Sequence, residues 1–177
     1  MEEIKGINIR LRLAKLPDAE FIISQRNNPK NNVNLSSQRF ISLEDQRAWM
    51  MSEESDKSSL YFIIENKKQQ VGTISLYNIA REGNSAELGR FICNNSIYAI
   101  DAEICLLEYA FNEMNLFEVY CRTKTNNKSV LSLHRNLFFS DSGEEIENDY
   151  SLLRQQMTRE RFKNIDYCDI KSLIRNI

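Results

Sequence analysis

Residues 86–111 join a strand-like run to an amphipathic helix, and the connection between them could bind an anion. The strand-like run covers residues 86–93, and the apolar stripe of a helix begins near Ile100. The free N–H groups and positive dipole end of such a helix attract groups such as pyrophosphate. A loop that cradles phosphate usually contains glycine, whereas this one carries Ala99 and Asp101. Most strand-loop-helix units bind no ligand. The spacing alone is therefore compatible both with an anion-binding site and with a connection that binds nothing.

Other reactive side chains are few. The chain has one histidine, His134, which confines any histidine chemistry to a single position. The four cysteines are Cys93, Cys105, Cys121 and Cys168, and no two of them form a Cys-x-x-Cys pair. In a cytoplasmic protein such cysteines are most simply small buried hydrophobes, so we expect neither a disulfide framework nor a metal site.

The composition is that of a globular protein. The 177 residues, 42% of them hydrophobic and 27% charged, suit a single domain spanning residues 1–177. A formal net charge of −2 provides no broad basic field, so nucleic acid is not an expected partner. No run approaches the roughly 20 apolar residues of a membrane span, so no membrane partner is expected. Residues 1–5 lack the basic start and apolar core of a secretion signal, and we expect a cytoplasmic location.

The pattern along the chain predicts the elements that would position these residues. Strands are predicted at residues 7–13, 60–64, 70–77, 86–93, 117–123, from 137, and at 150–153. Helices are predicted at residues 17–26, 42–50, from 100, and at 127–136. The segment after Thr158 is amphipathic and helical in pattern. Successive strands mixed with crossover helices indicate an α+β fold with a mixed sheet.

The order of these elements and their local sequences resemble those of the GNAT superfamily of N-acetyltransferases over nearly the whole chain. The segments that carry the resemblance are Ile9-Arg10-Leu11-Arg12, Arg26-Asn27-Asn28-Pro29, Phe40-Ile41-Ser42-Leu43-Glu44, Val71-Gly72-Thr73-Ile74-Ser75-Leu76, Ala86-Glu87-Leu88-Gly89, Ala102-Glu103, Leu106-Leu107-Glu108-Tyr109-Ala110-Phe111, Asn126-Asn127-Lys128-Ser129 and Tyr150-Ser151-Leu152-Leu153. The branch that it resembles includes ribosomal-protein alanine acetyltransferases and bacterial amino-sugar acetyltransferases. The resemblance implies a mostly antiparallel, twisted sheet of about seven strands, about four flanking helices and a C-terminal helical extension.

The resemblance also implies acetyl-coenzyme A as acyl donor, a primary amine as acceptor, and no metal. The implied cofactor contacts are Phe91, Ile92 and Cys93 for the pantetheine arm, Ile97, Tyr98, Ala99, Ile100, Asp101 and Ala102 for the pyrophosphate, and Asn127. In the family the pyrophosphate loop reads Arg/Gln-x-x-Gly-x-Gly/Ala, and its glycines fall on Ala99 and Asp101. A carboxylate at Asp101 repels pyrophosphate unless it faces solvent or caps the helix.

Two residues are candidates for proton transfer within this resemblance. The acceptor amine must be neutral to attack the thioester, and an acid can protonate the departing thiolate. Glu87 shares a strand face with Gly89 and is the candidate base or water-positioner; the alternative is an ordinary polar strand residue. His134 falls where the family has its thiolate-side tyrosine, and the alternative is a surface or partly buried helix residue. Phe138 falls where the family has a glycine.

The acceptor is expected near the end of the first helix. Gln25, Arg26 and Asn27, with Trp49 and Tyr77, could bind a hydroxyl-rich or phosphate-bearing amine. The planar fork of Arg26 suits a nucleotide diphosphate, although such a residue can also cap its own helix.

The expected function is therefore acetyl transfer to an amine, with an amino sugar or a nucleotide-linked amino sugar favoured as acceptor over a peptide. Two alternatives stay open: a ribosomal-protein type N-terminal acetyltransferase, and a catalytically silent GNAT-like domain that binds a ligand or partner. The lost glycines favour the silent domain. A homodimer contact through the segment after Thr158 is also left open.

Overall fold

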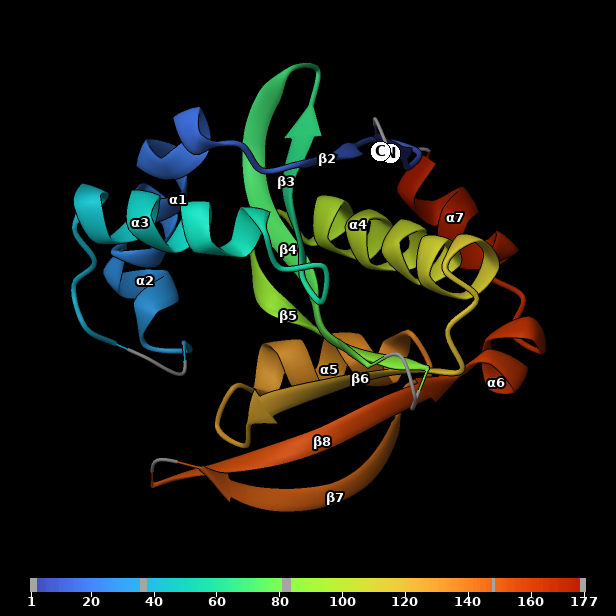
Figure 1. Ribbon diagram of the computed structural model, residues 1–177. Coiled ribbons are helices and arrows are strands. Elements are labelled where there is room, and N and C mark those ends of the chain that lie inside the picture. Colours follow the sequence, from blue (N-terminus) through green and yellow to red (C-terminus); the bar gives the residue numbers. More distant parts are fainter. Residues whose placement is uncertain (1–2, 36–37, 81–83, 148, 176–177) are drawn as a thin grey trace.

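The computed structural model describes residues 3–35, 38–80, 84–147 and 149–175. Within these ranges, eight strands form one sheet in the order β1-β2-β3-β4-β5-β6-β8-β7 (Figure 1). The strands are β1 (Ile4–Lys5), β2 (Arg10–Leu13), β3 (Leu60–Asn66), β4 (Gln69–Ala80), β5 (Ser85–Cys93), β6 (Glu118–Lys124), β7 (Ser140–Glu147) and β8 (Tyr150–Thr158). Only β5 and β6 pair in parallel among them. The predicted α+β class with a mostly antiparallel mixed sheet is confirmed, although about seven strands were expected.

The extra strand arises at the N-terminus. The alternation at residues 7–13 predicts one strand, but only Arg10–Leu13 of this range forms a strand, β2; a turn precedes it, and β1 lies before that turn at Ile4–Lys5. The N–H groups of Ile7, Asn8 and Ile9 are donated to the Asp101 carboxylate, at 2.9, 2.5 and 3.2 Å. Because a backbone donor satisfied by a side chain does not need a neighbouring strand, the turn replaces the first half of the predicted strand.

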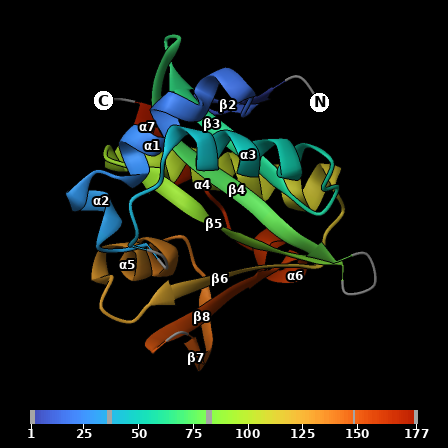
Figure 2. The ribbon, with the colours of Figure 1, turned by 60° about the vertical axis from the view of Figure 1, so that its left-hand side comes forward.

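Helices cover both faces of the sheet (Figure 2). The helices of the described residues are η1 (Leu16–Asp18, a 3-10 turn), α1 (Ala19–Arg26), α2 (Pro29–Asn32), α3 (Leu43–Glu54), α4 (Ser96–Glu108), η2 (Tyr109–Glu113, a π-helical turn), α5 (Lys128–Asn136), α6 (Arg159–Lys163) and α7 (Cys168–Arg175). The four helices expected beside the sheet correspond to α1, α3, α4 and α5. None of the described helices is both long and apolar enough to cross a membrane.

The alternation of β3 explains the two layers of helices. Tyr61 and Ile63 belong to a core cluster formed with α1 and α3. Phe62 and Ile64, which point to the opposite face, belong to the main core that includes α4. Both faces of β3 are therefore buried, which is why this strand is a continuous apolar run.

Helix α4 begins four residues earlier than predicted. It starts at Ser96, directly after its N-cap Asn95, whose side chain accepts hydrogen bonds from the N–H groups of Ile97 and Tyr98. The expected loop at residues 94–99 is therefore reduced to two residues, and Ile100 lies inside the helix. An asparagine cap followed by residues without glycine or proline is sufficient to start the helix at this point.

The segment after Thr158 forms α6 and α7 and packs on the same chain. Phe162 contacts Phe111, with ring centroids 4.9 Å apart, and the Tyr167 hydroxyl donates to the Leu137 carbonyl at 3.1 Å. The carbonyl of Ile174 accepts a hydrogen bond from the Asn8 side chain at 2.8 Å. The predicted C-terminal helical extension thus completes the core near α4 and reaches the turn between β1 and β2.

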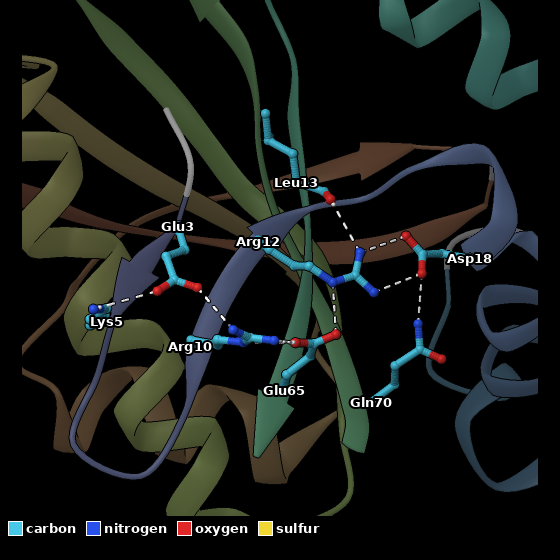
Figure 3. A network of polar contacts seen from close by, with 8 residues as sticks. All are labelled: Glu3, Lys5, Arg10, Arg12, Leu13, Asp18, Glu65 and Gln70. Atoms are coloured by element: carbon cyan, nitrogen blue, oxygen red, sulfur yellow. Dashed lines mark hydrogen bonds and ion pairs between the residues drawn. The ribbon is translucent and has the colours of Figure 1, made fainter. Parts of the chain in front are cut away.

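An ion-pair network joins strands β2 and β3 to the η1 turn that follows β2 (Figure 3). Glu65 on β3 accepts from Arg10 and Arg12 on β2, with Nε–O distances of 2.8 and 2.7 Å. Arg12 also pairs with both carboxylate oxygens of Asp18, at 2.7 and 2.8 Å, and Gln70 donates to Asp18 at 2.7 Å. Burial tends to raise the pKa of Glu65, but the hydrogen bonds from Arg12 and Arg10 outweigh it and hold that pKa below its usual value.

Candidate active site

The candidate site lies where β5 and β6 separate. These parallel strands pair only at residues 85–87 and 118–120, after which β6 turns away (Figure 2). From Leu88 onward, the backbone groups of β5 that face β6 have no strand partner within the described chain. Two cavities open in the gap, and both are lined by Asn34, Leu35, Phe91, Ile92 and Val130. Together they form a continuous path along the free edge of β5.

A bulge in β5 shapes the inner end of this path. Thr73 of β4 pairs with Ile92 and Ser75 pairs with Gly89, so two residues of β5 oppose one residue of β4. Arg90 sits in the bulge with a φ of +49°, an uncommon conformation for a residue with a side chain. Gly89 is required because a Cβ there would lie 2.9 Å from the Tyr77 hydroxyl oxygen.

The first cavity has a volume of about 200 Å³ and contains most of the charged groups of the site. Its charged lining residues are Arg26, Glu87, Arg90, Arg122, Lys124 and Glu147. Tyr61, Tyr77 and His134 also line it. Tyr61 is a buried residue of the core cluster formed with α1 and α3, and it lines the cavity as well.

Glu87 is buried in the wall of this cavity and accepts four hydrogen bonds. Oε1 accepts from the Tyr77 hydroxyl at 2.7 Å and from Arg122 Nε at 3.1 Å. Oε2 accepts from Asn78 Nδ2 and Arg122 Nη2, both at 3.1 Å. A carboxylate has about four lone-pair positions, and all are used here. Glu87 therefore holds Arg122 and Tyr77 in place and has no free lone pair for an incoming proton.

Arg90 is held on the opposite wall. Its Nη1 donates to Glu53 Oε2 at 2.7 Å and to Ser59 Oγ at 3.1 Å. Its guanidinium lies over the rings of Trp49 and Tyr77, 4.9 and 4.4 Å from their centroids. Trp49 therefore supports Arg90 and does not itself line either cavity.

Two cations of the first cavity have no acidic partner among the described residues. Arg26 Nε and Lys124 Nζ are buried atoms without a hydrogen-bond partner there. Burial lowers the pKa of both groups from their usual values, and Lys124 Nζ lies 3.7 Å above the Tyr150 ring. In contrast, Glu87 and Glu147 both pair with Arg122. The lining as a whole has four cations and two acids, and one of the cations, Arg90, is paired with Glu53, so a net positive charge remains at the cavity.

The second cavity has a volume of about 580 Å³ and reaches the starts of α4 and α5. Neutral polar side chains dominate its lining: Asn31, Asn34, Asn94, Asn127, Asn136, Ser96, Ser129 and Ser132. The described lining residues include one lysine, Lys30, and no acid. Such a surface can donate hydrogen bonds to phosphate without like-charge repulsion.

The structure separates the ten predicted cofactor residues into two groups. Phe91, Ile92, Cys93, Ala99, Ile100 and Asn127 line the second cavity, whereas Ile97, Tyr98, Asp101 and Ala102 do not. Asp101 faces the turn between β1 and β2, where its carboxylate accepts the three backbone hydrogen bonds described above. The N–H groups of Ile97 and Tyr98 at the helix start are bonded to the Asn95 side chain.

The predicted acceptor residues are also divided. Arg26 and Tyr77 line the first cavity, but Gln25 and Asn27 do not. Asn27 instead fixes the backbone of Ile41 through two hydrogen bonds of 2.9 and 3.0 Å. Sequence reasoning missed Arg90, Arg122 and Lys124, although charged residues within apolar strands were a signal that could have identified them.

His134 is buried and faces two different partners. Its Nδ1 lies 2.9 Å from Gln155 Oε1, and its Nε2 lies 3.4 Å from Glu103 Oε1. Burial lowers the pKa of His134 to about 4 and raises that of Glu103 to about 8. At neutral pH the imidazole is therefore uncharged, and its one N–H is directed to Gln155.

The chain is similar to known proteins both in a sequence family and in its fold. A family model described as an acetyltransferase (GNAT) domain matches residues 8–140. The structure of spermidine N-acetyltransferase from Vibrio cholerae in complex with CoA and spermine is 20% identical, with a TM-score of 0.82, and the match covers 89% of this chain and 99% of that one. A dodecameric structure of the Vibrio cholerae enzyme in an intermediate state is also 20% identical, with a TM-score of 0.75 and coverage of 89% and 97%. No curated protein sequence matches this chain.

Proposed function

This chain belongs to the acetyltransferase (GNAT) family, and from that premise we propose that it moves an acetyl group from acetyl-coenzyme A to the primary amine of a small anionic acceptor. The family and the N-acetyltransferase class predicted from the sequence are confirmed by the match over residues 8–140. The donor, the acceptor and the roles of individual residues are the proposal.

The observation that carries the proposal is the free edge of β5 between two connected cavities. Unpaired strand groups at Phe91, Ile92 and Cys93 can bind an extended amide-containing chain as a further strand would. The asparagine and serine side chains of the second cavity can donate to phosphate oxygens. Acetyl-coenzyme A, which supplies a thioester open to attack by an amine, contains both an amide-linked arm and phosphates.

We place the pyrophosphate beside the start of α4 and not directly on it. Asn95 already accepts the N–H groups of Ile97 and Tyr98, so an anion at this helix start must displace the asparagine side chain or bind beside it. Ser96 and Lys30 line the adjacent cavity wall and are suited to the second arrangement. We therefore assign the phosphates mainly to the polar side chains of the cavity.

The two candidate residues for proton transfer are both occupied by other contacts. Glu87 can act as a base or hold a water only if Tyr77 or Asn78 gives up its hydrogen bond. Neutral His134 directs its proton to Gln155 and so has none to give to a thiolate. In this proposal Glu87 positions Arg122, and the cations of the first cavity stabilise negative charge that develops on the thioester oxygen and sulfur.

The charge of the first cavity favours an acceptor that carries an anionic group besides its amine. Arg26 and Lys124 lack acidic partners, and the lining carries four cations against two acids, Glu87 and Glu147, which share Arg122. An amino sugar linked to a nucleotide diphosphate fits this charge, because phosphate oxygens would pair with cations that are now uncompensated.

The experiment is a steady-state measurement of thiol release with acetyl-coenzyme A and a panel of amines. We expect turnover with a nucleotide-linked amino sugar, and an increase of its KM of about 10-fold or more in Arg26→Met, since a hydrogen bond to a charged group is worth about 1.5–3 kcal/mol. Arg47→Met is the matched control, because Arg47 is an exposed arginine on α3 outside both cavities. An unchanged KM in Arg26→Met would refute the anionic acceptor.

A polyamine acceptor is the second candidate, favoured because similar solved structures are named spermidine N-acetyltransferases. Arg26→Met distinguishes the two candidate acceptors, because it should change their turnover in opposite directions. Removing the cation of Arg26 would improve turnover of spermidine through loss of repulsion, whereas it would impair turnover of a phosphorylated amine.

The silent-domain alternative is tested by a thermal-shift titration with acetyl-coenzyme A. A ligand that binds the native state raises the melting temperature by mass action. Absence of a shift at millimolar acetyl-coenzyme A, together with no thiol release for any amine or peptide in the panel, would overturn the enzyme proposal for this chain.

A further inference from the structure

A second group of reactive side chains lies in the protein interior next to the first cavity. It consists of Glu103 on α4, Cys121 on β6 and His134 on α5, which we call the buried triad. Their exposed fractions are 0%, 1% and 2%. Each residue offers one ligand atom, and the three atoms lie within 4.8 Å of one another. Neither the family match nor the proposed function uses Glu103 or Cys121.

Several polar atoms of the buried triad lack hydrogen-bond partners. Both carboxylate oxygens of Glu103 and Nε2 of His134 are buried and have no hydrogen-bond partner among the described residues. Buried polar atoms nearly always have a partner, and leaving one without costs about 1–3 kcal/mol. Two of these atoms, Glu103 Oε1 and His134 Nε2, lie 3.4 Å apart, which indicates that a partner shared by both is missing.

The protonation state of His134 follows from its neighbours. Gln155 Nε2 lies 2.8 Å from Asp141 Oδ1, and because Asp141 accepts from Arg135 as a carboxylate, Gln155 must present its NH₂ group there. Gln155 Oε1 therefore faces His134, 2.9 Å from Nδ1, and accepts the Nδ1–H. The lone pair of Nε2 is left pointing toward Glu103. A metal-binding histidine is typically oriented in this way, by donating its other N–H to an oxygen.

We propose that Glu103, Cys121 and His134 bind one divalent transition-metal ion, with Zn²⁺ as the best match to their oxygen, sulfur and nitrogen atoms. Tetrahedral Zn²⁺ with bonds of about 2.0–2.1 Å places a nitrogen and an oxygen ligand about 3.3 Å apart. The observed Nε2–Oε1 distance is 3.4 Å. The sulfur lies within 4.8 Å of the other two ligand atoms, and it has to settle at its own ligand distance of about 2.3 Å from the ion.

The charge of the group suits a divalent ion in an apolar interior. A Glu103 carboxylate and a Cys121 thiolate together cancel the charge of Zn²⁺, and neutral His134 adds none. Without an ion, burial keeps the acid and the thiol protonated, because it raises the pKa of Glu103 to about 8 and that of Cys121 well above its usual value. Metal binding therefore releases both protons.

The position of the buried triad provides an entry path for the ion and lets a bound ion connect three elements of the fold. His134 lines the first cavity, so an ion can reach Nε2 through the gap between β5 and β6. The three ligands come from α4, α5 and β6, which meet around this gap. A bound ion would connect these elements and restrict the opening in which the proposed substrates meet.

The test is calorimetric titration of chelator-treated protein with ZnCl₂ at pH 7 in buffers of different ionisation enthalpy. We expect one ion per chain and release of about two protons per ion. Glu103→Gln, which preserves shape, should release about one proton, and Cys121→Ser should bind at least about 100-fold more weakly. Gln155→Leu should weaken binding by about 10–100-fold, because it removes only the group that orients His134.

Cys105→Ser and Cys168→Ser are the matched controls. Cys105 is a buried thiol on α4 outside the triad, and Cys168 is an exposed one. With Co²⁺ in place of Zn²⁺, we expect a thiolate-to-metal charge-transfer band that disappears in Cys121→Ser and persists in both controls. Circular dichroism of each variant checks that it is folded. The proposal is overturned if the folded wild type binds no stoichiometric Zn²⁺, or if binding and the cobalt band are unchanged in Cys121→Ser.

Discussion

Asp101 offers a test of whether the start of α4 borders the proposed cofactor site. Asp101 is 3% exposed, and its carboxylate accepts hydrogen bonds from three consecutive N–H groups, at Ile7, Asn8 and Ile9. A hydrogen bond to a charged group contributes about 1.5–3 kcal/mol, which sets an upper limit of about 4.5–9 kcal/mol for three. In an Asp101→Ala variant, the N–H groups of Ile7 and Asn8 are only partly buried and can bond to water instead. The N–H group of Ile9 is buried and cannot. We therefore expect Asp101→Ala to lower the free energy of unfolding by about 3–5 kcal/mol.

The measurement is urea unfolding at pH 7 followed by circular dichroism. Glu108→Gln is the control, because Glu108 is a half-exposed acid on the same helix that pairs with Lys171. Its loss should cost no more than about 1 kcal/mol, as for other exposed ion pairs. Gly6→Ala provides a second perturbation, since a Cβ there would lie 2.7 Å from Asp101 Oδ1. Its cost should be smaller in Asp101→Ala than in the wild type.

The same variant separates a structural Asp101 from one that borders the cofactor. A carboxylate that faces the β1–β2 turn leaves the affinity for acetyl-coenzyme A unchanged within about threefold in Asp101→Asn. A carboxylate beside the pyrophosphate would repel it, and Asp101→Asn would then bind the cofactor more tightly. A stability loss below about 1 kcal/mol in Asp101→Ala, or a tenfold gain in affinity in Asp101→Asn, would refute the assignment.

Three further variants test other parts of the structure. Lys68 has a φ of +70° in an exposed two-residue turn, so Lys68→Gly should raise the free energy of unfolding by about 1 kcal/mol; a lower melting temperature would contradict this. Glu65→Gln should cost about 2 kcal/mol at pH 7, and urea titrations should show the difference shrinking below pH 4.5, because a lowered native pKa stabilises the fold only while the acid is ionised; a pH-independent cost would contradict it. Asn95→Ala should cost about 1 kcal/mol of stability and strengthen acetyl-coenzyme A binding several-fold by freeing two N–H groups; weaker binding would show that the asparagine itself contacts the cofactor.

Strands and helices that are determined by a local pattern of apolar residues could be predicted from the sequence. The alternation at residues 60–64 and 70–77 and the apolar stripe from Ile100 give strands and a helix wherever they occur in a soluble protein, because burial of one face stabilises each of them. The order of these elements was enough to indicate the family, which the match over residues 8–140 confirms. The boundaries were less accurate, as the helix start at Ser96 shows. A single cap residue decides such a boundary, and its signal is weak beside that of a whole apolar stripe.

The chemistry of the site depended on residues far apart in the chain. Glu87 was identified as a candidate from strand alternation, but its four hydrogen bonds come in part from Arg122, 35 residues away. Asp101 was placed near the phosphates because of its position at the helix start, yet its partners are 92 to 94 residues earlier. The spacing of Glu103, Cys121 and His134 matches no metal motif, and only the packing of α4 and α5 against β6 brings them together. Local periodicity determines which face of an element is buried, but the partner of a buried charge is set by which elements pack against it, and that is decided by the tertiary structure.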